Sequence, residues 1–154
     1  MKKIFLFSFL FAIMSCKKEE VGQTISYIKN STSHTIKLLP YNTSVLDNSN
    51  VKVISANSTL EVYSANVRGK TIDPCFGTLL QPYDSVLVVY DDTYKIPHIK
   101  FNLTYVGSKK VLFNSNRSIS NASNWTKTIT NETKYSIEGN FNYTFIEQDY
   151  IDAQ

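Results

Sequence analysis

The side chains best suited to chemistry in this sequence are two cysteines, Cys16 and Cys75, and two histidines, His34 and His98. A cysteine nucleophile needs a nearby base to form its thiolate, but neither histidine lies in a recognisable Cys/His signature. A lone thiol in an exported domain is usually buried as a small apolar side chain. We therefore predict a structural Cys75, with a hydrolase nucleophile as the alternative.

Asp91, Asp92 and His98 form the densest group of possible metal ligands. Carboxylate oxygens could hold calcium, and an imidazole could join a transition-metal site. Two aspartates at the end of a strand are, however, ordinary turn residues whose side chains bind nearby backbone amides. The turn interpretation is favoured. No zinc-spacing cluster, phosphate loop or nucleophile elbow occurs, so no cofactor is expected.

Trp125 lies in a polar run of Asn, Ser and Thr residues. An indole face among amide groups could bind a sugar. Tryptophan is nevertheless highly buried on average, so this side chain could instead cover one end of the core. We favour the covering role and keep Trp125 as a ligand-binding candidate.

The first sixteen residues have the order of a secretion signal. Lys2 and Lys3 precede an apolar run from residue 4 to 14, and Ser15 and Cys16 follow it. Eleven helical residues rise only about 16 Å, against roughly 30 Å of hydrocarbon in a bilayer. The run is therefore predicted to be a signal peptide rather than a permanent membrane span.

Ile13-Met14-Ser15-Cys16 resembles a lipobox, the cleavage motif of bacterial lipoproteins. The resemblance implies a diacylglyceryl group on the Cys16 sulfur and cleavage of the Ser15–Cys16 bond. Two or three acyl chains hold a protein stably on a membrane. We expect residues 1–15 to be the signal peptide, 16–23 the lipidated cysteine with its tether, and 24–154 a single domain.

The predicted tether begins with charged residues that could carry an address. Lys18, Glu19 and Glu20 follow Cys16. In some Bacteroidota, a lysine and two acids at this place are thought to direct lipoproteins to the cell surface. The resemblance implies an outer-membrane protein exposed at the surface, with a periplasm-facing protein as the alternative. A solvated charged tether is the simpler interpretation.

The charge of the mature chain excludes one class of partner. Removing residues 1–15 takes away Lys2 and Lys3 and no acid, so 14 basic residues face 13 acidic ones and the net charge falls from +3 to +1. A nearly neutral domain lacks the basic surface that nucleic-acid binding requires. The expected partners are the membrane, through the lipid on Cys16, and a glycan or an envelope protein.

Apolar residues alternate with polar ones over most of the mature chain, which predicts strands. The pattern indicates a first hairpin around residues 25–27 and 36–38, and a second pair of strands around 51–53 and 60–62. Residues 86–90 are apolar on both faces and should lie centrally, followed by a link at 91–97 and a strand over 99–105. Residues 114–133 are predicted as a polar loop.

The end of the chain has two interpretations. Residues 135–145 form either one long bent strand or a tight hairpin at Gly139-Asn140. A helical turn could follow at 147–150.

Seven to nine short strands without a long helix predict an all-β fold. A two-sheet antiparallel β-sandwich, immunoglobulin-like or similar, buries these strands best, and a small β-barrel is the alternative. The core is expected to contain Val86, Val88, Phe101, Leu103, Phe141 and Tyr143.

Three stretches of the chain resemble short lipoproteins of the Bacteroidota: Ser15 to Glu20, Asp84-Ser85-Val86 to Tyr90-Asp91-Asp92 with His98 after it, and the ending from Tyr143 to Ala153. The resemblance implies a compartment and no particular chemistry. Two function classes remain. One is a non-enzymatic binding module that uses loops at one end of the sandwich. The other is a hydrolase or metal-dependent enzyme that uses Cys75 or the group Asp91, Asp92 and His98.

Overall fold

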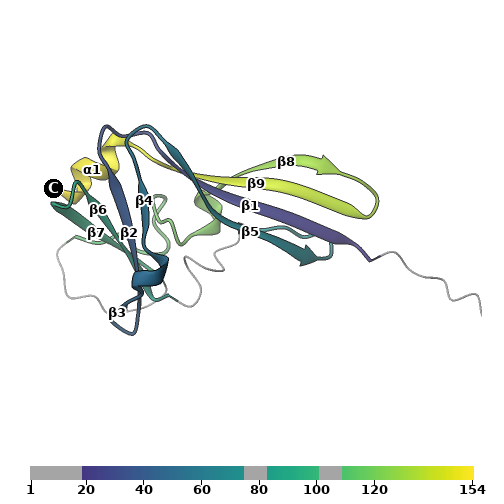
Figure 1. Ribbon diagram of the computed structural model, residues 1–154, viewed down its shortest axis with the longest axis horizontal. Helices are drawn as coiled ribbons and strands as arrows, with labels where there is room; N and C mark the ends of the chain where they lie inside the picture. The colour runs from purple at the N-terminus through teal and green to yellow at the C-terminus, as the bar shows by residue number, and fades with distance from the viewer. Residues whose placement is uncertain (1–18, 75–82, 101–108) are drawn as a thin grey trace, which may run out of the picture.

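The computed structural model describes residues 19–74, 83–100 and 109–154, which form two β-sheets and one α-helix (Figure 1). The strands are β1 (Val21–Asn30), β2 (Ile36–Asn42), β3 (Val45–Leu46), β4 (Lys52–Ile54), β5 (Thr59–Arg68), β6 (Ser85–Tyr90), β7 (Tyr94–Ile99), β8 (Thr126–Glu132) and β9 (Ser136–Phe145). Two 3-10 turns (Asn48–Asn50 and Ala122–Asn124) and helix α1 (Glu147–Ala153) complete the described elements.

The first sheet, sheet A, has the strand order β5-β1-β9-β8. Its two central strands, β1 and β9, run parallel, while β5 and β8 pair antiparallel to them. Figure 1 shows these strands continuing past the second sheet as a long arm. Alternate residues of β9 are buried along its whole length, so one side of this central strand is covered even on the arm.

The second sheet, sheet B, has the order β3-β2-β6-β7, and β4 pairs with β2. The apolar run predicted to lie centrally is β6, and it does have a partner strand on each side. The two sheets are not closed into a barrel. The prediction of a two-sheet β-sandwich is therefore confirmed, although the parallel pair β1–β9 departs from an all-antiparallel arrangement.

The predicted first hairpin is wrong, because β1 and β2 lie in different sheets. The buried Asn30 side chain holds the crossing between them. Its amide nitrogen donates to the carbonyls of His34 (2.7 Å) and Ser55 (3.0 Å), and its oxygen accepts from the Thr32 backbone (3.0 Å). These bonds satisfy backbone groups that leave a ladder where the chain changes sheets.

The second predicted pair also separates, since β4 joins sheet B and β5 joins sheet A. Asn57 makes the turn between them with a positive φ of 53°, a conformation that asparagine tolerates well. Only Ile54 of β4 is buried, and Val53 is exposed. The alternation around residue 52 therefore predicted the wrong buried side chains.

Residues 136–145 form one long strand, which resolves the two interpretations of the chain's end. Gly139 continues the strand, and a Cβ there would lie 2.5 Å from Cδ1 of Ile72. A Cβ at Gly22 on the neighbouring strand would lie 2.7 Å from Cγ2 of the same isoleucine. The two glycines thus leave room for Ile72 to cover sheet A closely.

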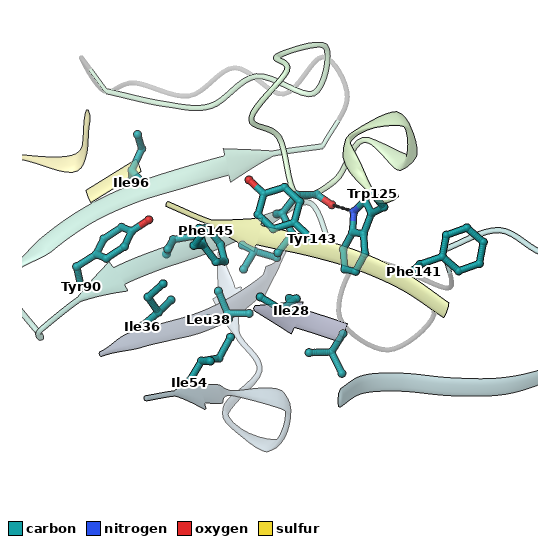
Figure 2. Packing of buried hydrophobic residues seen from close by; sticks show 14 of the residues in the cluster. Ile28, Ile36, Leu38, Ile54, Tyr90, Ile96, Trp125, Phe141, Tyr143 and Phe145 are labelled. Carbon is teal, nitrogen blue, oxygen red and sulfur yellow. Dashed lines mark hydrogen bonds between the residues drawn. The ribbon is translucent and has the colours of Figure 1, made fainter. Parts of the chain in front are cut away.

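The core lies where sheet B faces sheet A (Figure 2). Figure 2 shows residues of β1, β2, β4, β6 and β9 converging there, including Ile28, Leu38, Ile54, Tyr90 and Phe145. Val86, Val88, Phe141 and Tyr143 are buried as predicted, while Phe101 and Leu103 lie outside the described residues. Burying each large apolar side chain contributes about 1.5–3 kcal/mol to the free energy of folding, so packing of these side chains stabilises the fold.

Three boundaries differ from those predicted. The predicted tether extends to residue 23, but β1 begins at Val21. The strand predicted to begin at residue 99 begins at Tyr94, after a turn in which Asp91 and Asp92 have positive φ. The predicted polar loop contains strand β8, which has no buried residue and therefore shows no apolar alternation. The predicted final helical turn is helix α1.

Candidate functional site

The predicted lipid anchor and part of its address lie outside the described residues. Cys16 and Lys18 belong to that part of the chain. The Glu19 carboxylate lies 2.6 Å from the guanidinium of Arg68, and the Glu20 carbonyl accepts a hydrogen bond from Gly69 N (2.8 Å). Two of the three address residues therefore contact the end of β5.

Trp125 is buried, with 7% of its surface exposed, directly before β8. Its indole nitrogen donates to the Ile119 carbonyl (2.9 Å), as the dashed line in Figure 2 shows, and its ring lies 5.6 Å from that of Tyr143. The side chain thus covers the core, and only a small part of the indole could meet a ligand.

The structure separates the three candidate metal ligands. Asp91 and Asp92 form the turn between β6 and β7, whereas His98 pairs with Val86 four residue pairs along the same hairpin. Four pairs correspond to roughly 13 Å. Asp91 accepts from the Thr35 backbone (2.9 Å), and Asp92 lies 2.6 Å from Nζ of Lys37. Both aspartates act as turn residues that bind neighbouring groups.

His98 lies in the interior, where it is 2% exposed. Its Nδ1 accepts a hydrogen bond from Ile119 N (3.2 Å). Burial, with a smaller contribution from Arg117, lowers the pKa of His98 to about 3. The imidazole is therefore neutral at physiological pH, and together with Trp125 it holds the peptide groups of Ile119.

A cluster that the sequence did not predict surrounds His34. Its Nδ1 lies 2.5 Å from Oδ2 of Asp91, and its Nε2 lies 3.1 Å from Oε1 of Glu147. The imidazole also stacks on Tyr150, with 3.5 Å between ring centroids and 15° between planes. We call these four residues the His34 cluster.

Three separate elements position the His34 cluster. His34 lies between β1 and β2, Asp91 begins the turn after β6, and Glu147 and Tyr150 belong to α1. Asp91 and Glu147 lie 57 and 113 residues from His34 in the sequence. No local spacing could have indicated this cluster, and the isolated histidine was its only signal.

The electrostatics of the His34 cluster favour a charged imidazole. The hydrogen bond to Asp91 is the largest influence, and it raises the pKa of His34 above its usual value of 6.5 against the opposing effect of burial. The same hydrogen bond lowers the pKa of the Asp91 carboxyl. Both ring nitrogens face carboxylates, so neither is left as a free base for catalysis.

A second ion pair holds the same helix from the core side. Arg117 Nε donates to Oδ1 of Asp149 (2.8 Å), and an Arg117 terminal nitrogen bonds the other carboxylate oxygen. The Asp149 side chain is only 8% exposed, and it also accepts from Ile146 N (2.8 Å) at the start of α1. This pair is a part-buried contact in which the carboxylate, and not the guanidinium, is the buried partner.

Within residues 19–74, 83–100 and 109–154, no group of three or more His, Cys, Asp and Glu side chains is arranged to hold a metal ion. No helix in these ranges is long and apolar enough to cross a membrane. Cys75, the nucleophile of the alternative hypothesis, lies outside them. No protein-family model and no curated protein matches the chain.

Proposed function

We propose that this protein is a lipid-anchored protein of the outer membrane whose β-sandwich is a non-enzymatic binding module. The proposed partner is a glycan or a protein of the envelope. The lipid would be carried by Cys16, as its lipobox resemblance implies.

The start of β1 is the observation that best supports this proposal. Val21 begins the strand only five residues after Cys16, and Figure 1 shows this end of β1 at the tip of the arm, away from sheet B. Five extended residues reach at most about 18 Å. A lipid on Cys16 would therefore hold the arm near the membrane and present the opposite end of the sandwich to partners.

The opposite end consists of loops, where binding residues are commonly found. The β1–β2 connection, the β6–β7 turn and helix α1 meet there through the His34 cluster. The proposed recognition surface is this loop end, rather than the largely buried Trp125. The binding module is preferred to an enzyme because Asp91, Asp92 and His98 make separate structural contacts.

Membrane fractionation of cells expressing Cys16→Ala tests the anchor. The variant should leave the membrane fraction, because a lipid can no longer be attached. Cys75→Ala is the matched control, since it removes the other cysteine and should stay with the membrane. A Cys16→Ala protein that still sediments with membranes after a high-salt wash would refute the anchor.

Surface labelling of intact cells tests the address. Replacing Lys18, Glu19 and Glu20 with Ala should reduce exposure to added protease while leaving the fold intact. Arg68→Ala is the control, because it removes the contact of Glu19 with β5 without changing the triplet. Equal labelling of wild type and triple variant would refute the address and leave the anchor proposal standing.

Glycan and envelope-protein arrays test the binding module. Binding should decrease when exposed loop-end residues Asp92 and Lys95 are replaced with Ala, and persist when exposed Ile129 on the arm is replaced with Thr. Binding lost only in the arm variant would place the recognition surface elsewhere. Hydrolysis of an array ligand that depends on Cys75 would favour the enzyme instead.

A further inference from the structure

Helix α1 is attached to the sandwich by two contacts that respond differently to pH. On the core side, Arg117 pairs with the largely buried Asp149, and the pKa of this arginine is raised further above its high usual value by that contact. At the loop end, His34 faces Asp91 and Glu147 and stacks on Tyr150. Histidine is the side chain that ordinarily changes charge between pH 5 and 8.

We propose that His34 is a protonation-dependent clasp that holds the C-terminal helix against the loop end of the sandwich. Carboxylates accept hydrogen bonds, and an imidazole can donate from both nitrogens only when it is protonated. Asp91 lies on one side of the ring and Glu147 on the other, so both hydrogen bonds can form at once only when the imidazole is protonated.

Loss of the proton weakens one of the two contacts, whichever tautomer results. If Nδ1 keeps its hydrogen, the lone pair of Nε2 faces the Glu147 carboxylate and the link to α1 is lost. If Nε2 keeps its hydrogen, the lone pair of Nδ1 faces Asp91, only 2.5 Å away. Two acceptors at that distance repel, so the ring must move and its stacking on Tyr150 changes.

The groups around His34 set the direction of the effect. Asp91 faces it from the β6–β7 turn, and Glu147 and Tyr150 face it from α1. Lys37 is the nearby cation on β2, and Asp92 neutralises it at 2.6 Å. Because the pKa of His34 is raised in the folded protein, its stabilising contribution is complete below pH 6.5 and is lost as the pH rises through the folded-state pKa.

Movement of the clasp would alter the surface that the loop end presents. The Tyr150 ring makes edge contacts with Tyr90 (5.7 Å between centroids) and Tyr94 (5.5 Å), so α1 covers part of β6 and β7. Opening would expose this aromatic surface. The clasp itself does not depend on the proposed function, because it concerns only how α1 is held.

Nuclear magnetic resonance of the whole 154-residue chain in mild detergent, between pH 5 and 9, tests the clasp directly. His34 should titrate above pH 6.5, and the Tyr150 and Ala153 resonances should shift with the same midpoint. His98 serves as the internal reference, because its pKa of about 3 keeps it neutral throughout this range. A His34 midpoint at or below 6.5, or α1 resonances independent of pH, would overturn the proposal.

Amide hydrogen exchange in α1, corrected for the intrinsic pH dependence of exchange, gives the size of the effect. Protection should fall roughly two- to fivefold between pH 6 and pH 9, as expected for losing exposed ion pairs. The pH-dependent decrease in protection should be absent in His34→Gln. It should remain in Asp92→Asn, because that substitution alters only the neighbouring ion pair with Lys37. A pH dependence unchanged in His34→Gln would assign the transition to another group and refute the clasp.

Discussion

The two histidines of this chain occupy opposite electrostatic environments. His34 is near the surface between two carboxylates, and its pKa is raised. His98 is buried near a guanidinium, and its pKa is lowered to about 3. The same side chain thus lies between two carboxylates that favour its protonated form in one place, and is a neutral hydrogen-bond acceptor in the other.

The two regions should respond to pH with opposite signs. Unfolding raises the pKa of His98 toward 6.5, so the unfolded state binds more protons and stability falls as the pH drops below 6.5. Unfolding lowers the pKa of His34, so the contribution of this residue to the stability of the folded protein decreases as the pH rises above 6.5. With respect to these two groups, stability should be greatest near the ordinary histidine pKa.

The largest effect is expected at the core-side contact of α1. Asp149→Ala leaves Arg117 without its carboxylate and removes the acceptor for Ile146 N. Because Asp149 is 8% exposed but Arg117 is 33% exposed, losing these part-buried charged hydrogen bonds should reduce the free energy of unfolding by about 1.5–3 kcal/mol. Asp152→Ala, on the exposed side of the same helix, is the control for urea denaturation. A loss below about 1 kcal/mol for Asp149→Ala would show that the ion pair is not structural.

His98→Asn should separate the hydrogen bond of the buried histidine from its titration. The amide oxygen can still accept from Ile119 N but does not ionise. On acidification below pH 6, the free energy of unfolding of the wild type should decrease by up to about 1.4 kcal/mol per pH unit, which is the slope for one proton. In the variant this part of the decrease should be absent. Urea denaturation at several pH values measures it. If the free energy of unfolding depended on pH in the same way in wild type and variant, the assignment of a neutral His98 would be refuted.

Trp125→Phe tests the other side of the same interior contact. The phenyl ring keeps most of the packing but cannot donate to the Ile119 carbonyl. The buried acceptor left behind should cost about 1–3 kcal/mol in thermal or urea unfolding. If stability were unchanged while binding to an array ligand disappeared, Trp125 would be a recognition residue and not a cover of the core.

His34→Gln should have the smallest effect of the four. The glutamine side chain can still reach one of the two carboxylates, and exposed ion pairs contribute little to the free energy of unfolding. The Tm should decrease by at most about 4 °C at pH 6, and this decrease should become smaller as the pH rises through the folded-state pKa of His34. A larger decrease at pH 9 than at pH 6 would contradict the raised pKa of His34.

Much of the local structure followed from the sequence, because side chains alternate between two faces of a strand. The central position of β6 followed from its apolar residues on both faces, and the long strand β9 was one of two open alternatives. Strand β8 was missed because all seven of its residues are exposed, so nothing in their order distinguishes them from a loop.

The sequence identified which residue types could form a site, but only the structure showed which contacts each of these side chains makes. Asp91 and Asp92 were placed correctly in a turn, and Trp125 covers the core as favoured. The His34 cluster could not be predicted, because hydrogen bonds to Asp91 and Glu147 join residues 57 and 113 positions away.

By itself the sequence determined the period of the strands, the apolar interior and the predicted export signal, since each depends on neighbouring residues. Tertiary structure alone decided which strands share a sheet, because β1 and β2 carry the same alternation whether they pair or separate. It also decided that the pKa of His34 is raised and that the pKa of His98 is lowered. Those shifts depend on desolvation and on partners from distant parts of the chain, which no local pattern records.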